Sequence, residues 1–262
     1  MRSFFLRLQK MNYRYIRLQK LDKEGHIIEV QFSNRTKHNA LSSELLRELI
    51  NAFNHLKELN NVKVIVLSSA TYSGVWSSGH DLNELKVKGF DPLSKKSAYK
   101  RFVMLLKNFQ KPVIVIVDGS VWGGAVEIVF LSDIIITTPQ AKFYLTALKI
   151  GFPYDIDGLM NLISATGNRI FREMFFTANG LTAKRAERLG IINYVVQKKS
   201  IMKHTLKIAT AVAENSNSAM SLVKLQLAKL NQQLPVTSDL KNINSLRKKI
   251  LRNRSYKTNL LQ

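Results

Sequence analysis

Two short glycine-containing stretches carry residues whose types and spacing could do chemistry. They are Trp76-Ser-Ser-Gly-His-Asp-Leu82 and Val121-Trp-Gly-Gly-Ala-Val-Glu127. Each follows an apolar run typical of a buried strand, residues 62–68 and 113–117, and the second leads into a helix-like segment, 125–131. Glycine at such a turn lets backbone N–H groups point outward without a side chain in the way. Two such N–H groups converging on one point would stabilise a developing oxyanion, usually the largest single contribution to catalysis at a carbonyl.

The rest of the chain predicts the elements that must position these two stretches. Strand-like and helix-like runs alternate, which favours a layered α/β fold. We expect strands over residues 27–32, 62–68, 113–117, 134–138 and 191–196. Between them the sequence predicts a polar loop over 34–39, a helix after Ser42, a helical stretch over 157–176 and a short helix between Thr182 and Gly190. Beyond Lys198 the chain is expected to be helical only, with a break near Pro235.

These runs indicate three segments: an N-terminal extension over residues 1–10, an α/β core over 11–197 and a C-terminal helical region over 198–262. The chain contains no cysteine, which excludes disulfides, thiol nucleophiles and thiolate metal sites and fits a reducing compartment. No apolar run approaches the ~18 residues of a transmembrane helix, and the first ten residues lack the apolar stretch of a secretory signal. We therefore expect a cytoplasmic protein that does not associate with membranes.

The net charge is strongly positive, at +22 from 40 basic and 18 acidic residues. Such an excess attracts polyanions, and nucleic acid is the first partner to consider. No helix-turn-helix, zinc-finger or RNP-like pattern accompanies the charge, so nucleic acid is not the partner we expect. The five histidines show no paired metal-ligand spacing, and no metal site is expected.

Together the two glycine stretches resemble the oxyanion-hole segments of the crotonase (enoyl-CoA hydratase/isomerase) superfamily, and their detail is most similar to its methylmalonyl-CoA decarboxylases. The resemblance implies a spiral of ββα units with C-terminal helices used in trimerisation, and hence a homotrimer or hexamer. It implies an acyl-CoA thioester as substrate, with no cofactor beyond the coenzyme A of the substrate. It runs from about Met11 to Tyr256, and the family's CoA-covering tail is replaced by Lys257-Thr-Asn-Leu-Leu-Gln262, which we expect to weaken CoA binding.

The resemblance also assigns roles to particular positions. It places the two oxyanion N–H groups on His80 and Gly124, with only the backbone of His80 implicated. Lys37 and Ala40 lie in Lys-His-Asn-Ala-Leu, which is similar to the segment that binds the CoA nucleotide. The pantetheine and thioester would be lined by Ser78, Gly79, His80, Asp81 and Leu82.

The expected reaction depends on what lies opposite the oxyanion hole. Addition of water to an enoyl thioester needs a positioned acid/base pair, which the hydratases supply with two glutamates. Glu127 matches the first, but the second falls at Ala147, which has no proton to give. Thr146 and Tyr154 stand instead in the frame Thr-x-x-x-x-Gly-x-Pro-Tyr, where the decarboxylases have their threonine and tyrosine.

Decarboxylation of a malonyl-type thioester needs an oxyanion hole for the enolate and an oriented carboxylate, but no base for bond breaking. We expect Tyr154 to hold the carboxylate, Thr146 to contact the substrate, and Trp122, Phe143 and Phe152 to line or support an apolar acyl pocket. The leading hypothesis is decarboxylation of (2-methyl)malonyl-CoA. Two alternatives stay open: a hydratase or other crotonase-fold enzyme that uses Glu127, and a catalytically silent basic binding protein.

Overall fold

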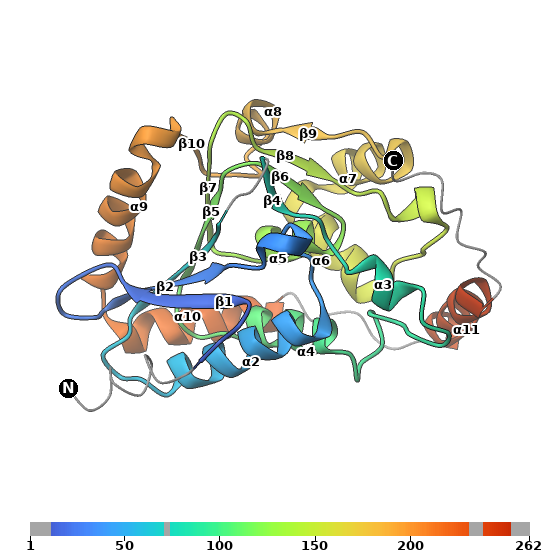
Figure 1. The fold of residues 1–262 in the computed structure, drawn as a ribbon, viewed down its shortest axis with the longest axis horizontal. Helices are drawn as coiled ribbons and strands as arrows, with labels where there is room; N and C mark the ends of the chain where they lie inside the picture. The colour runs from blue at the N-terminus through green and yellow to red at the C-terminus, as the bar shows by residue number, and fades with distance from the viewer. Residues whose placement is uncertain (1–11, 71–73, 231–237, 253–262) are drawn as a thin grey trace.

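A computed structural model describes residues 12–70, 74–230 and 238–252 of the 262-residue chain. The expected extension over 1–10, the break near Pro235 and the altered tail after Tyr256 lie outside the described residues. The first of two sheets contains β1 (Ile16–Lys20), β2 (Ile27–Phe32), β3 (Val64–Ser69), β5 (Val113–Val117), β7 (Ile134–Thr137) and β10 (Tyr194–Val195), in that spatial order. Only β1 runs antiparallel to its neighbour. The predicted α/β class is confirmed (Figure 1).

A second, smaller sheet contains β4 (Val75–Ser77), β6 (Ser120–Trp122), β8 (Lys142–Tyr144) and β9 (Leu181–Thr182). The strands β4, β6 and β8 each follow a strand of the first sheet, β3, β5 and β7, after only a few residues. The chain therefore steps from the first sheet to the second three times in the same direction. Because β4, β6 and β8 are parallel, their carboxyl ends meet at one edge of the second sheet.

Helices connect these strand pairs and end the chain. They are α2 (Ser43–Lys57), α3 (Leu82–Leu85), α4 (Ala98–Lys107), α5 (Gly124–Phe130), α6 (Ile156–Thr166), α7 (Asn168–Thr177), α8 (Ala183–Arg188), α9 (Lys198–Ala213), α10 (Asn217–Leu230) and α11 (Ser238–Arg252), with short 3₁₀ turns η1 (Arg35–Lys37) and η2 (Ala147–Ile150). Among the described residues, no helix combines the length and the apolar character that crossing a bilayer requires.

Local signals explain most of these boundaries. The predicted cap residues are confirmed, since the Ser42 and Thr182 side chains accept hydrogen bonds from the backbone of the following turn. Two predictions need correction. The helical stretch over 157–176 is two helices, because the chain turns at Gly167 with φ of 74°. The strand predicted over 191–196 is only Tyr194–Val195, since Ile191 and Ile192 are buried in a turn instead of pairing with β7.

Both faces of the first sheet are covered. Alternate residues such as Val64, Val66 and Ile114 pack with Ile201 and Ala209 of α9, which lies along one face (Figure 1). The residues between them pack on the other face in a large cluster with α2, α4 and α5. Full burial on both faces accounts for the continuous apolar runs that predicted these strands.

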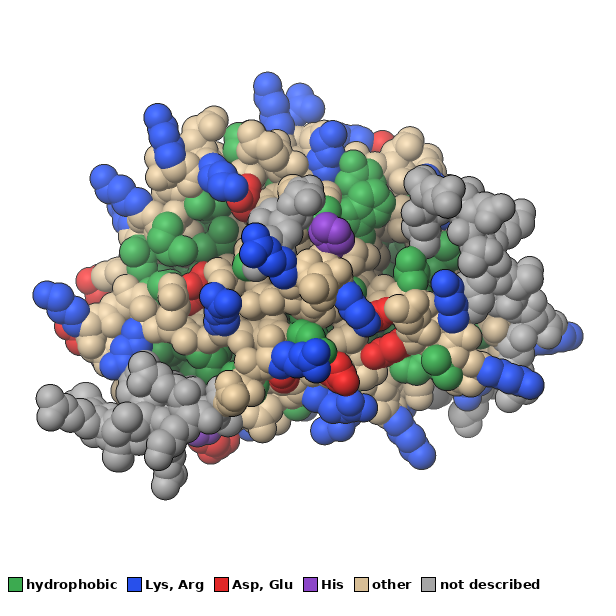
Figure 2. Space-filling view, in the orientation of Figure 1, with side chains coloured by type: hydrophobic (Ala, Val, Ile, Leu, Met, Phe, Trp, Pro, Cys, Tyr) green, Lys and Arg blue, Asp and Glu red, His purple; other side chains and the backbone are tan. Residues whose placement is uncertain are grey.

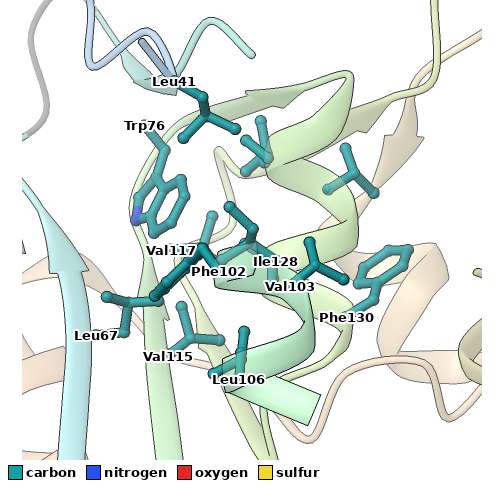
Figure 3. Packing of buried hydrophobic residues seen from close by; sticks show 14 of the residues in the cluster. Leu41, Leu67, Trp76, Phe102, Val103, Leu106, Val115, Val117, Ile128 and Phe130 are labelled. Atoms are coloured by element: carbon teal, nitrogen blue, oxygen red, sulfur yellow. The ribbon is translucent and has the colours of Figure 1, made fainter. Parts of the chain in front are cut away.

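The first glycine stretch is anchored in this core by its first residue. The Trp76 indole is fully buried and points into the same cluster as Leu41, Val117 and Phe102 (Figure 3). Its Nε1 donates a hydrogen bond of 2.7 Å to the Ile116 carbonyl of β5. The buried ring and this bond fix the strand from which residues 78–82 emerge, and so fix the start of the candidate site.

Candidate active site

The second sheet brings the two glycine stretches together. In the parallel pairing, Ser77 of β4 lies opposite Val121 of β6, and Trp122 lies opposite Tyr144 of β8. The segments that leave the carboxyl ends of these strands, 78–80, 123–124 and 146–147, therefore emerge side by side. The edge of a parallel sheet at the carboxyl ends of its strands is where ligands commonly bind in α/β proteins.

Glycine is required where the two stretches meet. Gly79 has φ of 79°, and a Cβ atom on it would lie 2.6 Å from the Trp122 carbonyl oxygen. A Cβ atom on Gly124 would lie 2.7 Å from His80 Nε2. Both distances are too short for any side chain, so the contact between the two stretches depends on glycine at both positions.

Both predicted oxyanion N–H groups are free to bind a ligand. Leu41 forms an isolated bridge with this segment by donating to the Gly79 carbonyl at 2.7 Å, and the His80 N–H takes no part in this bond. Gly124 is the first residue of α5, where an N–H has no partner within the helix, and no side chain caps this end. In the described part of the chain neither N–H donates to another protein atom.

A pocket of about 380 Å³ opens at this place. Its wall is formed by His38, Val75, Ser78, Gly79, His80, Leu82, Leu85, Trp122, Gly123, Gly124, Thr146, Ala147, Ile150, Phe152 and Tyr154. Most of the residues singled out from the sequence are among them. Of the described residues that form this wall, none is Asp, Glu, Lys or Arg. The site therefore offers hydrogen-bond donors in apolar surroundings, with no carboxylate, lysine or arginine among the described residues of its wall.

Two residues with hydroxyl groups, Thr146 and Tyr154, line this pocket together with the oxyanion segments. Tyr154 follows the turn at Gly151 and precedes α6, and its ring packs edge-on against Phe175 with centroids 5.3 Å apart. Burial raises the pKa of Tyr154, so its hydroxyl keeps its proton at neutral pH. Thr146 is the N-cap residue of η2, and its side chain makes no cap hydrogen bond. Within the described residues, neither hydroxyl has a hydrogen-bond partner, and both can serve a substrate.

Glu127 lies behind the pocket and does not form part of its wall. It is fully buried; its Oε2 lies 2.6 Å from Tyr99 Oη, and its Oε1 accepts a hydrogen bond from Asn161 Nδ2 at 2.8 Å. Burial raises the pKa of Glu127, although both hydrogen bonds oppose this effect. The carboxyl is thus held by protein partners and would reach a substrate only by breaking one of these bonds.

The imidazole of His80 packs between the two stretches. Its ring lies edge-on to Tyr99 with centroids 4.4 Å apart. Burial lowers the pKa of His80 to about 4, so the ring is neutral at pH 7. The side chain places no positive charge in the pocket, and the predicted contribution of His80 through its backbone alone stays a prediction.

The residues predicted to bind the CoA nucleotide lie beside the pocket instead of lining it. Lys37 Nζ is 2.6 Å from the buried carboxylate of Asp81, and the Lys37 carbonyl accepts from the Ala40 N–H at 2.9 Å. Asp81 also caps α3 through the Asn83 N–H. This ion pair joins the 35–40 loop to the first glycine stretch, and Ser78 of the pocket wall donates from its Oγ to the carbonyl of the half-exposed lysine at 3.2 Å.

Of the three aromatic residues expected around an acyl group, two are found on the wall. Trp122 and Phe152 line the pocket, and Trp122 stacks on Tyr144 at 4.0 Å. Phe143 is fully buried behind them against Phe130.

Among the described residues no three His, Asp or Glu side chains are grouped as metal ligands would be. A reaction without a metal or separate cofactor stays a prediction.

Comparison with known proteins decides the family. The family model described as enoyl-CoA hydratase/isomerase matches residues 22–257. This chain belongs to the enoyl-CoA hydratase/isomerase family. The match covers both glycine stretches, and it confirms the resemblance that their residues indicated.

Relatives within the enoyl-CoA hydratase/isomerase family have more than one activity. The chain is 33% identical to the methylmalonyl-CoA decarboxylase of Escherichia coli K12 over 249 residues, which cover 94% of this chain and 93% of that protein. It is 29% identical to the short-chain-enoyl-CoA hydratase of Clostridium acetobutylicum over 210 residues, or 78% of each. A structure of methylmalonyl-CoA decarboxylase complexed with 2S-carboxypropyl-CoA matches with a TM-score of 0.87 at 33% identity, covering 92% of this chain and 91% of that one. The crotonase fold is thereby confirmed.

Three residues of this site were missed by sequence reasoning. Tyr99 and Asn161 surround Glu127, and Arg247 of α11 donates to the Pro153 carbonyl next to Tyr154. Tyr99 lies among Phe102, Val103 and Leu106 on the buried side of α4, where the sequence pattern predicts only a core residue. No motif surrounds any of the three, so only the fold identifies their partners.

Proposed function

We propose that this crotonase-family enzyme decarboxylates a malonyl-type CoA thioester, methylmalonyl-CoA to propionyl-CoA or malonyl-CoA to acetyl-CoA. The observation that carries the proposal is the composition of the pocket wall. Two free backbone N–H groups and two hydroxyl groups lie in an apolar pocket, with no carboxylate, lysine or arginine among the described residues that line it.

Each of these groups has a place in the reaction. The thioester oxygen accepts hydrogen bonds from the N–H groups of His80 and Gly124, and the Tyr154 hydroxyl holds the substrate carboxylate out of the thioester plane, with Thr146 beside it. The C–C bond between the α-carbon and the carboxylate then breaks, and the carboxylate leaves as CO₂. The electron pair of the broken bond moves into the thioester group, which becomes an enolate. The oxyanion hole stabilises that charge most strongly when it is fully developed. A proton from solvent then completes the product at the α-carbon.

Hydration is the second candidate, and a specific observation keeps it in view. Glu127 is present three residues after Gly124, and the chain is similar to a hydratase over 78% of its length. Against hydration, Ala147 lies on the pocket wall where the second carboxylate would be needed, and Glu127 is bonded to Tyr99 and Asn161. A reaction that must deliver a proton and a hydroxide together has no acid/base pair here.

The test separates the two reactions on one preparation. We expect mass spectrometry to show conversion of methylmalonyl-CoA or malonyl-CoA and no hydration of crotonyl-CoA. Replacement of Glu127 by Gln should slow decarboxylation by a few-fold at most, because the amide keeps the shape and the hydrogen bonds. Hydration of crotonyl-CoA that is lost in Glu127→Gln, without any decarboxylation, would replace the proposal by its alternative.

The third hypothesis, a silent basic binding protein, predicts no turnover and salt-sensitive binding to polyanions. On the face shown in Figure 2, Lys and Arg side chains are spread over the surface and its rim, with Asp and Glu side chains among them, and they do not form one patch. On this face the distribution favours a general basic surface over a nucleic-acid site. We propose that the partner is the acyl-CoA thioester.

A homotrimer or hexamer is part of the proposal. The α10 helix exposes four large apolar side chains, with Leu222, Val223, Leu225 and Leu227 each 42–55% accessible in the single chain. Apolar groups this exposed on one helix are typical of a surface that another copy covers. Light scattering on the purified protein should give a mass of three or six chains, and a monomer at micromolar concentration would contradict it.

A further inference from the structure

Tyr99 contacts both halves of the oxyanion hole, although it belongs to neither glycine stretch. It lies in α4 and is only 2% exposed. Its ring packs edge-on against the His80 ring, and a Cβ atom on Gly124 would lie 3.0 Å from its Cε2. One side chain from a third element therefore sets the space between His80 and Gly124.

The Tyr99 hydroxyl lies between two oxygen atoms. It is 2.6 Å from Glu127 Oε2 and 3.0 Å from the Gly124 carbonyl oxygen. A tyrosine hydroxyl has one proton and can donate to only one of them at full strength. The remaining contact is a hydrogen bond only if its other atom carries a proton. The Gly124 carbonyl oxygen carries none, so that proton would have to come from Glu127.

The contacts on the other side of Glu127 determine which of its oxygen atoms accepts and which can donate a hydrogen bond. Lys107 Nζ donates to Asn161 Oδ1 at 3.0 Å, so the Asn161 amide must turn its Nδ2 toward Glu127 Oε1, 2.8 Å away. Oε1 is then an acceptor, and Oε2 is the atom that can carry a proton. Every contact is satisfied when Glu127 donates to Tyr99 and Tyr99 donates to Gly124.

The surroundings of Glu127 agree with a neutral carboxyl. The side chain is fully buried, and burial, the largest effect, raises the pKa of Glu127, whereas the contacts with Tyr99 and Asn161 and the charge of Lys100 act in the opposite direction. The cation that faces it, Lys100, is itself paired with Asp155 at 2.5 Å, so its charge is largely compensated.

We propose that Tyr99 is a positioning residue of the oxyanion hole, which it holds through a hydrogen-bonded chain from Asn161 through a protonated Glu127 to the Gly124 carbonyl. The ring fixes the distance between His80 and Gly124, and the hydroxyl fixes the orientation of the first turn of α5. The Gly124 N–H then points at the thioester oxygen before the substrate arrives. This inference rests on the proposed function for its site, but its test does not require decarboxylation.

The direct readout is the C=O stretch of propionyl-CoA labelled with ¹³C at the thioester carbonyl, measured by infrared difference spectroscopy on the bound complex. Bound to the unmodified enzyme, the stretch should fall below that of free propionyl-CoA, because two donors polarise the carbonyl. Tyr99→Phe keeps the ring and removes the hydroxyl, so it should lose a large part of this shift. Tyr194→Phe, at an exposed tyrosine beside His204, is the matched control and should retain all of it.

Glu127 gives a second, independent comparison should Tyr99→Phe fail to fold. Glu127→Gln can still accept from Asn161 and donate to Tyr99, so it should retain the carbonyl shift, whereas Glu127→Leu should lose it as Tyr99→Phe does. In turnover, Tyr99→Phe should lower kcat on the order of tenfold while KM changes less than about twofold, the pattern of an interaction that matters mainly in the transition state.

The outcomes distinguish this inference from the proposed function. A carbonyl shift that Tyr99→Phe leaves unchanged would overturn the inference, as would the absence of any shift with the unmodified enzyme. A shift that depends on Tyr99 in a protein that releases no CO₂ from either malonyl-type thioester would support the inference and refute the decarboxylase. A Glu127→Gln variant that behaves like Glu127→Leu would refute the protonated chain.

Discussion

Arg247 binds Asp91 through two parallel hydrogen bonds of 2.8 and 2.9 Å, and its Nε donates to the Pro153 carbonyl at 3.1 Å. The guanidinium is nearly buried and also lies over the Phe152 ring at 5.9 Å. This one side chain thus joins the last described helix to the backbone of the residue before Tyr154. The arrangement makes α11 part of the support of the pocket wall.

Loss of the Arg247 contacts with Asp91 and Pro153, here called the Arg247 clamp, should affect the position of Tyr154 more than the stability of the fold. We expect Arg247→Lys to lower kcat several-fold, because a lysine cannot make the forked pair and the Pro153 contact together. Arg247→Ala should cost about 2–4 kcal/mol of local stability, since a nearly buried charge pair loses one partner. Limited proteolysis near α11 and steady-state kinetics check both effects.

The matched control is Lys248→Ala at the exposed neighbouring position. It should leave both protease sensitivity and kcat unchanged. If Lys248→Ala and Arg247→Ala behave alike, the clamp has no specific role.

Alanine substitutions at two glycines with similar φ distinguish the cost of backbone strain from the cost of steric overlap. Gly79 and Gly190 have φ of 79° and 71°, but a Cβ atom on Gly79 would contact the Trp122 carbonyl at 2.6 Å, whereas one on Gly190 would contact nothing within 4 Å. Gly190→Ala should cost about 1–2 kcal/mol of unfolding free energy from conformation alone. Gly79→Ala should cost about 1–3 kcal/mol more and abolish turnover, because the backbone of both stretches must shift.

Urea unfolding of the two variants measures this difference directly. Equal losses of stability, with activity retained in Gly79→Ala, would show that the two stretches do not need their close contact.

The buried histidine predicts a pH dependence of stability. Burial lowers the pKa of His80 to about 4, from an ordinary value near 6.5 in the unfolded chain. Between these values the unfolded state binds one more proton than the folded state, so stability is complete above pH 6.5, falls as the pH drops toward 4 and levels off below it. Since His80 borders the pocket and keeps some contact with solvent, we expect a loss of about 1–3 kcal/mol.

Urea titrations at pH 7, 6 and 5 check this loss against His80→Gln, which cannot titrate. The unmodified protein should lose more stability than the variant over this interval. Parallel curves for the two proteins would mean that the imidazole ionises freely in the folded state.

Lys37, which is paired with Asp81, is the residue that we expect to bind the nucleotide of a CoA thioester. We expect Lys37→Ala to raise KM for a CoA thioester about tenfold with kcat little changed, because a phosphate contact contributes to binding in the ground and transition states alike. The matching pantetheine thioester, which lacks the nucleotide, should be unaffected. Lys203→Ala on the exposed side of α9 is the control for general charge. Equal effects on both thioesters would place Lys37 away from the nucleotide.

Features that depend on residues close together in the sequence could be predicted, whereas features that depend on distant residues could not. Residues 113–117 are five consecutive β-branched residues and form β5 as predicted, because a strand buried on both faces needs no alternation. The residue pattern alone did not predict the second sheet, since its strands of two or three residues are too short to show a period. Its existence nevertheless decides where the glycine stretches meet.

The same limit applies to the site. The glycines at 79 and 124 are visible in the sequence because tight packing restricts their residue type. The role of Tyr99 depends on a carboxyl 28 residues away, and that of Arg247 on a carboxylate 156 residues away. Such pairings are set by the tertiary fold, and a single sequence contains no local signal for them.

The most direct test of the central claim is the reaction of methylmalonyl-CoA with the purified enzyme in D₂O, followed by mass spectrometry. If CO₂ leaves to give an enolate in the oxyanion hole, the product is propionyl-CoA with one deuteron at the α-carbon, formed at a rate that falls strongly in Tyr154→Phe. If methylmalonyl-CoA persists unchanged while the same preparation hydrates crotonyl-CoA, the decarboxylase is refuted.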